Sequence, residues 1–252
     1  HPRPDAIGGA GMAVLAERLG YATFPYPQKV TLHTQKLAPV LQMDIPGEVE
    51  MGGIKKEYDR YRTFLTEYQP RVHGMALDES GHRHQAAHNE YWVAFATHRG
   101  RDVGVMLYKL KGEEITRFTM QVTQFYYHTS QGKYLLLDWI ARHIDQAEEV
   151  ELWLDPSSRP ETWLSDLELT KQQLYIPPMG RVLDLEHVAG LKVGPGSFTA
   201  RIVDQFCPWQ EGLWTFDSQD GRLQVRPGTD AQCTLSIQGL TALLYGTHDL
   251  AS

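Results

Sequence analysis

The chain has 252 residues and a formal net charge of −7, a length that fits one large domain or two of ordinary size. Its 42% hydrophobic and 22% charged residues are typical of a globular protein and exclude a disordered chain. The negative charge argues against a general nucleic-acid binder, and no apolar run reaches the roughly 18–20 residues of a membrane span. Two cysteines exclude a disulfide scaffold and predict a reducing cytoplasmic location.

The first 100 residues contain turn signals, one predicted strand, one short predicted helix near the start and two further predicted helices. A short helix is expected around Val14 to Leu19, ending at Gly20, and residues 29–33 alternate like a strand. Apolar residues then recur at steps of 4, 3, 4 and 3, which predicts an amphipathic helix that ends at Pro70. These residues are Ile54, Tyr58, Tyr61, Leu65 and Tyr68. The segment around Tyr91, Trp92 and Phe95 is interpreted as a second helix.

The middle of the chain predicts an α/β-type unit. Residues 103–110 indicate a buried strand, 112–114 a turn, and 118–122 a half-buried strand, most simply paired as an antiparallel hairpin. A helix with apolar residues at 136, 137, 140, 141 and 144 and a strand over 150–154 follow. The proline- and serine-rich run at 155–160 then breaks the pattern and is the predicted domain boundary.

Short segments beyond residue 180 predict a second unit. Residues 181–185 indicate a strand that enters a small helix over 186–191. Further strands are expected at 200–206, 213–216, 223–225 and 233–237, with a hairpin turn at 217–221. Gly239 opens a final apolar helix over 240–245. We interpret this as an antiparallel sheet capped by a helix, an α+β unit.

The best metal candidate is a histidine cluster, His82, His84 and His88 with Glu90. His84 and His88 are four residues apart and would share a helix face. However, the His-Glu-x-x-His signature is absent and Arg83 lies within the cluster, so we favour a solvated loop and predict no metal site.

The remaining candidate motifs are interpreted as structural. The glycine-rich tracts at 8–11 and 194–197 lack the strand-to-helix context of a phosphate loop. No Gly-x-Ser-x-Gly elbow is present, and both Cys207 and Cys233 are expected to be buried. The aromatic run Phe125-Tyr126-Tyr127 could line a pocket, and sheet packing explains it equally well.

Several strings resemble the enhanced intracellular survival (Eis) family of acetyltransferases. The most specific is the run from Met179 to Leu185, which is similar to the entry strand of that family's sterol-carrier-like domain. The other strings are Leu15–Tyr21, Tyr91-Trp92, the strand pair around Tyr108 and Phe118, the hairpin at Asp220-Gly221, and Gly239–Gly246. The family's chain consists of a catalytic GNAT domain, a GNAT-like domain without the cofactor motif, and a sterol-carrier-like domain.

The resemblance implies an α+β fold in three parts. Residues 1–24 would be the tail of a preceding GNAT domain, 25–155 a GNAT-like mixed sheet with helices, and 156–252 a sterol-carrier-like antiparallel sheet with helices. Because the chain begins at His1 without an initiator methionine, we expect a fragment or a processed product, with most of the first GNAT domain absent.

The resemblance assigns no catalytic or cofactor-binding residue. GNAT enzymes hold the acetyl-CoA pyrophosphate with an Arg/Gln-x-x-Gly-x-Gly/Ala loop at a helix N-terminus. The run 71–76 satisfies these letters but leads into a loop, and 101–106 fails at its last position and enters a strand, so both are interpreted as chance matches. Ala16 stands where the family's acid is a tyrosine, and Ser252 cannot supply the family's terminal carboxylate base.

The function implied for the parent protein is transfer of an acetyl group from acetyl-CoA to a small-molecule amine. The present chain would shape the acceptor site, with an acidic lining suited to a cation, and the interface of a homo-oligomer. It would bind no acetyl-CoA by itself. Two alternatives stay open, a non-enzymatic lipid-binding module of the sterol-carrier type and a purely structural assembly fragment.

Overall fold

The computed structural model describes residues 18–23, 27–72, 75, 77, 91–114, 117–172, 179–218 and 221–244. The chain forms two compact units. The central unit comprises residues 27–174, and the terminal unit combines residues 1–26 with 175–252. The structure therefore differs from the sequence analysis in two respects. The N-terminal residues group with the C-terminal ones, and the central unit extends past the predicted boundary at 155/156.

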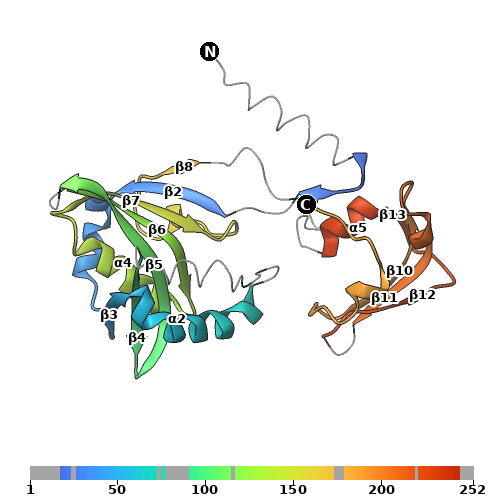
Figure 1. Cartoon of the computed structure of the whole chain (residues 1–252), viewed down its shortest axis with the longest axis horizontal. Helices are drawn as coiled ribbons and strands as arrows, with labels where there is room; N and C mark the ends of the chain where they lie inside the picture. Colours follow the sequence, from blue (N-terminus) through green and yellow to red (C-terminus); the bar gives the residue numbers. More distant parts are fainter. Residues whose placement is uncertain are drawn as a thin grey trace, which may run out of the picture. The chain divides into compact units, whose positions relative to one another are not determined.

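A seven-stranded sheet forms the centre of the central unit (Figure 1). Its order is β3-β4-β5-β6-β7-β2-β8. The strands are β2 (Gln28–His33), β3 (Glu48–Gly53), β4 (Trp92–His98), β5 (Arg101–Glu114), β6 (Arg117–Tyr127), β7 (Ala147–Leu154) and β8 (Thr170–Gln172). All neighbouring pairs are antiparallel except β6 and β7, which run parallel. The predicted hairpin of β5 and β6 and the strands at 29–33 and 150–154 are confirmed.

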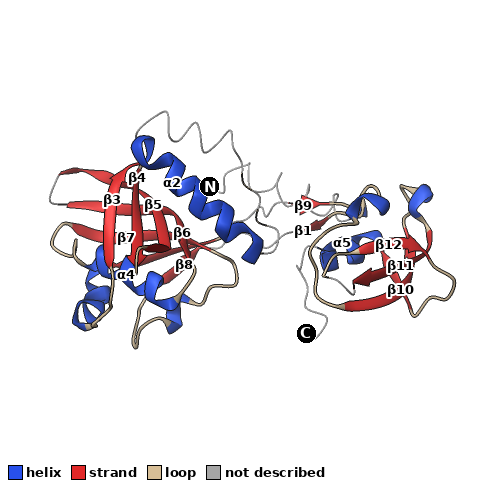
Figure 2. Cartoon of the chain, turned by 90° about the horizontal axis from the view of Figure 1, so that it is seen from below, coloured by secondary structure: helices blue, strands red, loops and turns tan. Residues whose placement is uncertain are grey.

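Helices cover both faces of this sheet (Figure 2). The predicted helix at 54–68 is confirmed as α2 (Ile54–Tyr68), which buries Tyr61, Phe64 and Leu65 against one face. The helix predicted from Leu136, Leu137 and Ile140 is confirmed as α4 (Ser130–Ala141). It covers the other face together with the 3-10 segment η1 (Thr34–Gln42). A second 3-10 segment, η2 (Gln69–Arg71), contains Pro70, where α2 ends.

The predicted helix around Tyr91 and Phe95 is wrong, because this segment is strand β4. Val93 and Phe95 face α2, whereas Ala94 and Ala96 face α4, and all four are fully buried. Burial on both faces removes the alternation that marks a half-buried strand. The predicted turn at 112–114 is also wrong, because β5 continues to Glu114.

The segment after β7 belongs to the central core. Trp163, Leu164 and Leu167 are buried among residues of α4 and the sheet, although the preceding run at 155–160 has the composition of a linker. Pro160 opens the 3-10 turn η3 (Pro160–Thr162), and β8 then pairs with β2. These apolar anchors explain why the central unit ends near residue 174.

The terminal unit has a four-stranded sheet of order β12-β11-β10-β13. The strands are β10 (Gly196–Val203), β11 (Gly212–Ser218), β12 (Gln224–Pro227) and β13 (Cys233–Ser236). The predicted β11–β12 hairpin is antiparallel, as expected, but β13 runs parallel to β10, so the sheet is mixed. The final helix is α5 (Ile237–Leu244), which starts before Gly239 and packs on the sheet through Ile237 and Leu240.

A short strand pair joins the two ends of the terminal unit. β1 (Ala22–Thr23) pairs with β9 (Met179–Gly180). The predicted strand at 181–185 is wrong, because this segment is irregular and pairs with no neighbouring strand. Its two buried residues, Val182 and Leu185, are three positions apart rather than two, and the backbone N–H of Val182 donates to the Thr241 hydroxyl of α5 instead of to a strand. The helix predicted at 186–191 shortens to the 3-10 turn η4 (Glu186–Val188).

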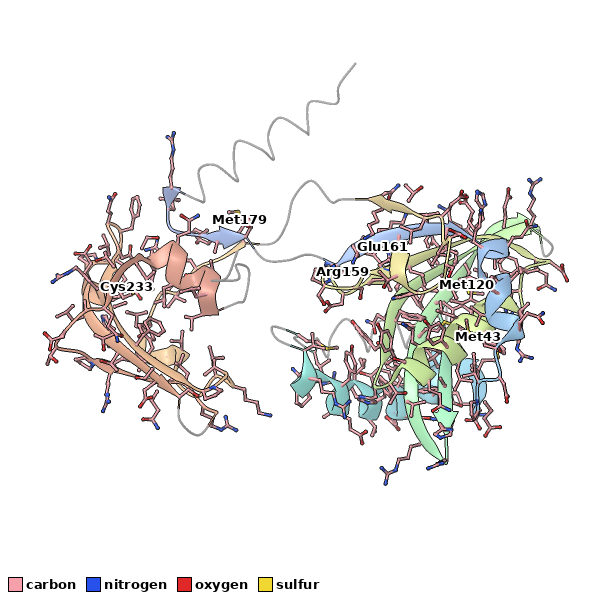
Figure 3. The ribbon with its side chains drawn as sticks, turned by 180° about the vertical axis from the view of Figure 1, so that it is seen from behind. Met43, Met120, Arg159, Glu161, Met179 and Cys233 are labelled. Atoms are coloured by element: carbon pink, nitrogen blue, oxygen red, sulfur yellow. The ribbon has the colours of Figure 1, made fainter. Side chains whose placement is uncertain are left out.

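The two cysteines differ in exposure. Cys207 is buried, as predicted, but Cys233 is exposed on β13 (Figure 3), which contradicts the prediction. β13 pairs only with β10 and is an edge of its sheet, so its alternating pattern does not correspond to a buried face. No helix within the described stretches is long and apolar enough to cross a membrane.

Candidate functional site

The parallel strands β6 and β7 separate at one end. Their last paired residues are Val122 and Leu152, although β6 continues to Tyr127 and β7 to Leu154. Beyond this pair, β6 stays bonded to β5 and β7 stays bonded to β2. Ligands of open α/β sheets bind outside the carboxyl ends of parallel strands, so this opening is the candidate functional site.

Helix α4 begins directly beside this opening. Thr129 caps the helix, and its hydroxyl accepts a hydrogen bond of 3.1 Å from the backbone N–H of Gly132. Gly132 is required by close packing, because a Cβ at this position would lie 2.2 Å from the carbonyl oxygen of Val103 on β5. The Lys133 N–H is also engaged, by the carbonyl of Thr129 at 3.1 Å. The first turn of α4 is therefore hydrogen-bonded to its N-cap residue and packs closely on β5.

The side chain of Trp163 packs against the free end of β6. Its ring stacks on Phe125 with centroids 5.8 Å apart, and its carbonyl accepts a hydrogen bond of 2.7 Å from the Tyr134 hydroxyl. The Lys133 ammonium lies 5.2 Å from the Trp163 ring and 4.5 Å from the Tyr134 ring. Burial lowers the pKa of Lys133. Trp163, Tyr134 and Phe125 thus pack together beside the free end of β6 and the start of α4.

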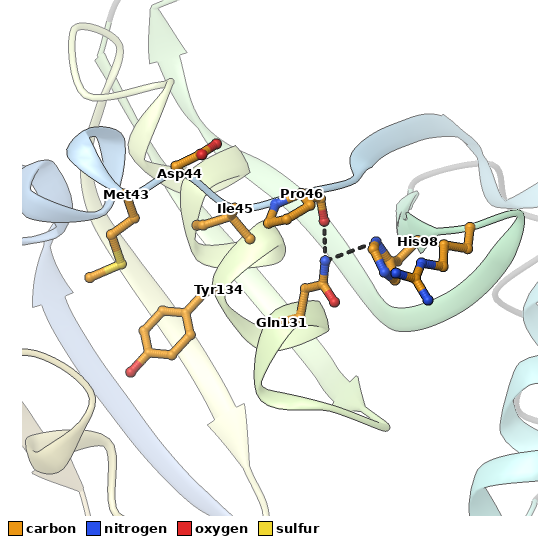
Figure 4. Close-up of a pocket in the computed structure, with 8 residues that line it drawn as sticks. Met43, Asp44, Ile45, Pro46, His98, Gln131 and Tyr134 are labelled. Carbon is orange, nitrogen blue, oxygen red and sulfur yellow. Dashed lines mark hydrogen bonds between the residues drawn. The ribbon is translucent and has the colours of Figure 1, made fainter.

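An open cavity of about 440 Å³ lies on the other side of the α4 N-terminus (Figure 4). The Gln131 side-chain amide donates to the carbonyl of Pro46 and lies 2.9 Å from His98 Nδ1. Arg99 and Tyr134 are also part of its wall. Gln131 therefore links the end of β4 to the loop before β3, a contact that positions α4 rather than one that performs chemistry.

Of the candidate residues of the sequence analysis, the structure places the 101–106 run and Phe125 beside the opening between β6 and β7, where Gly104 pairs with Tyr127 and Met106 with Phe125. The 101–106 run lies within β5, as its strand context predicts, and Gly196 starts β10. In the 71–76 run, only Arg71, Val72 and Met75 are described, next to the end of α2. Phe125 serves sheet packing. The histidine cluster, Glu90, the 8–11 tract, Ala16 and Ser252 lie outside the described residues.

Sequence reasoning missed the string Thr129-Ser130-Gln131-Gly132-Lys133-Tyr134, which follows a strand and opens a helix. It has glycine at the fourth position of the Arg/Gln-x-x-Gly-x-Gly/Ala loop. The first position is threonine, and the sixth, where the loop requires glycine or alanine, is Tyr134. The signal that could have found it is the strand-glycine-helix context rather than the letters.

The residues present do not fit an acetyl-CoA pyrophosphate. Tyr134 introduces a large ring where the backbone must approach the anion, and the Thr129 hydroxyl already accepts the Gly132 N–H. Among the described residues, no group of three or more histidine, cysteine, aspartate or glutamate side chains is arranged to hold a metal ion.

Comparison with family models gives two matches. Residues 73–182 match a model described as an acetyltransferase (GNAT) domain, and residues 185–252 match one described as a sterol carrier protein domain. The chain therefore contains one region similar to a GNAT acetyltransferase domain and another similar to a sterol carrier protein domain. The GNAT match lies mostly within the central unit and includes both β6 and α4. No curated protein matches the chain.

Solved structures share the fold at low sequence identity. A GCN5-related N-acetyltransferase from Anabaena variabilis is 13% identical with a TM-score of 0.72, covering 92% of this chain and 60% of that one. One from Kribbella flavida is 19% identical with a TM-score of 0.69, covering 93% and 59%. Eis1 from Mycobacterium abscessus is 14% identical with a TM-score of 0.59, covering 98% and 69%. The chain spans about 60% of the length of the first two structures.

Proposed function

We propose that the chain is the C-terminal part of an Eis-like N-acetyltransferase that transfers an acetyl group from acetyl-CoA to a small-molecule amine. In this proposal, the upstream region binds acetyl-CoA and carries the chemistry. The central unit is a GNAT-like scaffold that shapes the acceptor site and the interface of a homo-oligomer, within the cytoplasm. The net charge of −7 favours a cationic acceptor.

The observation that carries the proposal is the aromatic packing at the free end of β6, beside the start of α4. Trp163 packs on the free end of β6, and Tyr134 bonds to it at the position where a cofactor loop needs a small residue. An acetyl-CoA molecule placed there would have to displace a tryptophan that is only 6% exposed. Losing that burial would cost about 3–5 kcal/mol, which makes the central unit a poor cofactor binder.

The direct test is a calorimetric titration of acetyl-CoA into the 252-residue chain and into a longer protein that includes the upstream region. We expect saturable binding only for the longer protein, together with release of free CoA thiol when primary amines are added. Backbone NMR of the shorter chain supplies the site-specific reading. The Gly132 and Lys133 amides should stay as unperturbed as the Gly239 amide in α5. Saturable binding that shifts Gly132 but not Gly239 would disprove the scaffold role.

A second candidate is an apolar-ligand module of the sterol-carrier type, favoured by the family match at residues 185–252. Against it, the side chains between the sheet and α5 are packed together as a core, including Phe216, Ile237 and Leu240. Native mass spectrometry of the chain purified from cells separates the two candidates. A co-purified lipid, bound in one-to-one ratio, would favour the module.

A further inference from the structure

We propose that the central unit binds a small oxyanion, a carboxylate or a phosphate group, in a cavity on the sheet face opposite α4. This site is separate from the opening between β6 and β7, and it does not depend on the acetyl transfer proposed above. The cavity has a volume of about 710 Å³. One wall comes from the C-terminal half of α2 and from η2. The other comes from the start of β5 and from His128, just beyond β6.

One part of the wall is held in place by an ion-pair network. The Arg60 guanidinium pairs with both carboxylate oxygens of Asp102, at 2.9 and 2.7 Å, and also contacts Glu50 at 2.5 Å. It lies over the Phe95 ring, 4.2 Å from the centroid. These contacts raise the pKa of Arg60, first through Asp102 and then, against the effect of burial, through Glu50. Arg60 and Asp102 therefore form a rigid, internally neutralised floor.

Two further arginines in the wall have no such partner. Arg71 and Arg101 are exposed, and within the described part of the chain neither forms an ion pair or a side-chain hydrogen bond. A guanidinium presents a planar fork of N–H donors that matches carboxylate and phosphate oxygens. Because the two come from η2 and from the first residue of β5, the fold brings them to one cavity from distant parts of the sequence.

His128 adds a polar group beside these arginines. Its ring packs on Phe64 at 4.6 Å and Tyr68 at 5.5 Å, and its buried Nδ1 has no hydrogen-bond partner among the described residues. Burial lowers the pKa of His128, and Arg71 lowers it further, while Glu67 acts in the opposite direction. The ring is therefore neutral near pH 7. Depending on its tautomer, the His128 Nδ1 atom can donate a hydrogen bond to a ligand in the cavity or accept one from it.

The distribution of charge in the wall, rather than its sum, favours a small anion. Three arginines and three carboxylates balance overall, but Asp102 and Glu50 are both engaged by Arg60, which leaves Arg71 and Arg101 as the cations without an ion-pair partner among the described residues. Glu67 has no ion-pair partner among the described residues, so it repels an extended polyanion that reaches across the cavity. A single carboxylate or phosphate between Arg71 and Arg101 can form ion pairs with both guanidinium groups, and it is small enough to stay away from the Glu67 carboxylate.

The test uses the full 252-residue chain and two probes, acetate and inorganic phosphate, in calorimetry and in NMR of ¹⁵N-labelled arginine side chains. We expect one-to-one saturable binding of at least one probe, with shifts at the Nε–Hε groups of Arg71 and Arg101. Arg101→Gln and Arg71→Gln should each weaken it by about tenfold, the usual scale for one charge-assisted contact. Arg159→Gln is the matched control, because Arg159 is exposed on the segment after β7 (Figure 3) and outside the cavity.

The comparison of the two probes identifies the class of ligand, because preference for acetate indicates a carboxylate and preference for inorganic phosphate indicates a phosphate. The proposal fails if neither probe saturates, or if Arg159→Gln weakens binding as much as Arg101→Gln, which would indicate general electrostatic attraction. It also fails if the shifts map to Gly132 and Lys133. That last result would count against the scaffold role of the central unit as well, whereas the other two would leave it intact.

Discussion

The two units of the chain bury charge differently. In the central unit, apolar clusters fill both faces of the sheet, and the most buried ion pair of its described residues, Lys29 with Glu151, keeps an exposure of 20% for each side chain. In the terminal unit, the Arg181–Asp204 pair is almost completely buried, at 5% and 1%. The smaller sheet therefore contains the more deeply buried charges.

The buried pair of the terminal unit connects segments that are far apart in the sequence. Both Asp204 carboxylate oxygens bind Arg181, at 2.6 and 2.7 Å, and the carboxylate also accepts hydrogen bonds from the Cys207 N–H and the Gln210 amide. Arg181 in turn donates to the carbonyl of Leu19. The cluster thus fixes the N-terminal segment onto β9 and the loop after β10. Such a pair specifies an arrangement more than it adds net stability.

The largest expected effect comes from Asp204→Ala. Removing the carboxylate leaves the Arg181 charge buried and unpaired, which costs about 3–5 kcal/mol. The terminal unit should therefore unfold at a much lower denaturant concentration, while the central unit keeps its midpoint. Hydrogen exchange followed by mass spectrometry measures the two units separately. Equal loss of protection in α4 and α5 would contradict the independence of the units.

The pH dependence of the same carboxylate gives an independent check. Burial by itself would raise the pKa of Asp204, but hydrogen bonds from the Phe206 N–H, Arg181 and the Cys207 N–H outweigh it, so the pKa is lowered. A lowered pKa means that the stabilisation is complete above the ordinary aspartate range and is lost as pH falls through the folded-state value. The wild-type terminal unit should lose stability in acid more steeply than the Asp204→Ala variant.

A smaller effect is expected from Gly132→Ala in the central unit. A Cβ at this position would meet the Val103 carbonyl at 2.2 Å, so α4 would have to move away from β5. Overpacking costs about 1–3 kcal/mol, and the better helix propensity of alanine returns up to about 1 kcal/mol. We expect a net loss of about 1–2 kcal/mol in the free energy of unfolding, measured by urea denaturation.

Gly239→Ala is the matched control in the terminal unit. Gly239 also lies in a helix, but a Cβ there would meet only the Ser236 hydroxyl, at an ordinary distance of 3.4 Å. The propensity gain should then dominate, and stability should be unchanged or slightly higher. If both substitutions had the same sign, close packing of α4 on β5 would not be the reason for Gly132.

The sequence could predict elements whose pattern comes from one buried face. Helix α2 was predicted from its apolar spacing because only one side of it packs on the sheet. Strand β4 could not be predicted in this way. Phe95 and Ala96 are buried on opposite faces of the sheet, so apolar and polar residues do not alternate along the strand. The parallel pairing of β13 with β10 was also beyond local patterns, since register between strands depends on contacts distant in sequence.

The candidate site was harder to predict than the fold. The letters of a cofactor loop led to Arg71 and Arg101, whereas the corresponding strand-to-helix junction lies at 129–134, where only the glycine is kept. The same two arginines meet at a different cavity, which no spacing rule indicates, because η2 and the start of β5 come together only through the packing of α2 on the sheet. Likewise, the predicted boundary at 155/156 assigns Trp163 to the terminal unit, whereas its ring packs on Phe125 of the central sheet.

The smallest expected effect is that of Glu148→Ala, which completes the comparison with Asp204→Ala. Both substitutions remove the carboxylate of an arginine pair, but Arg117 and Glu148 are 73% and 55% exposed. Water solvates Arg117 as soon as its partner is lost, so no buried charge is left behind. We expect no measurable shift in the urea midpoint of the central unit, at either low or high salt. A clear loss of stability would mean that burial does not explain the difference between the units, and that the position of an arginine pair within its sheet matters more.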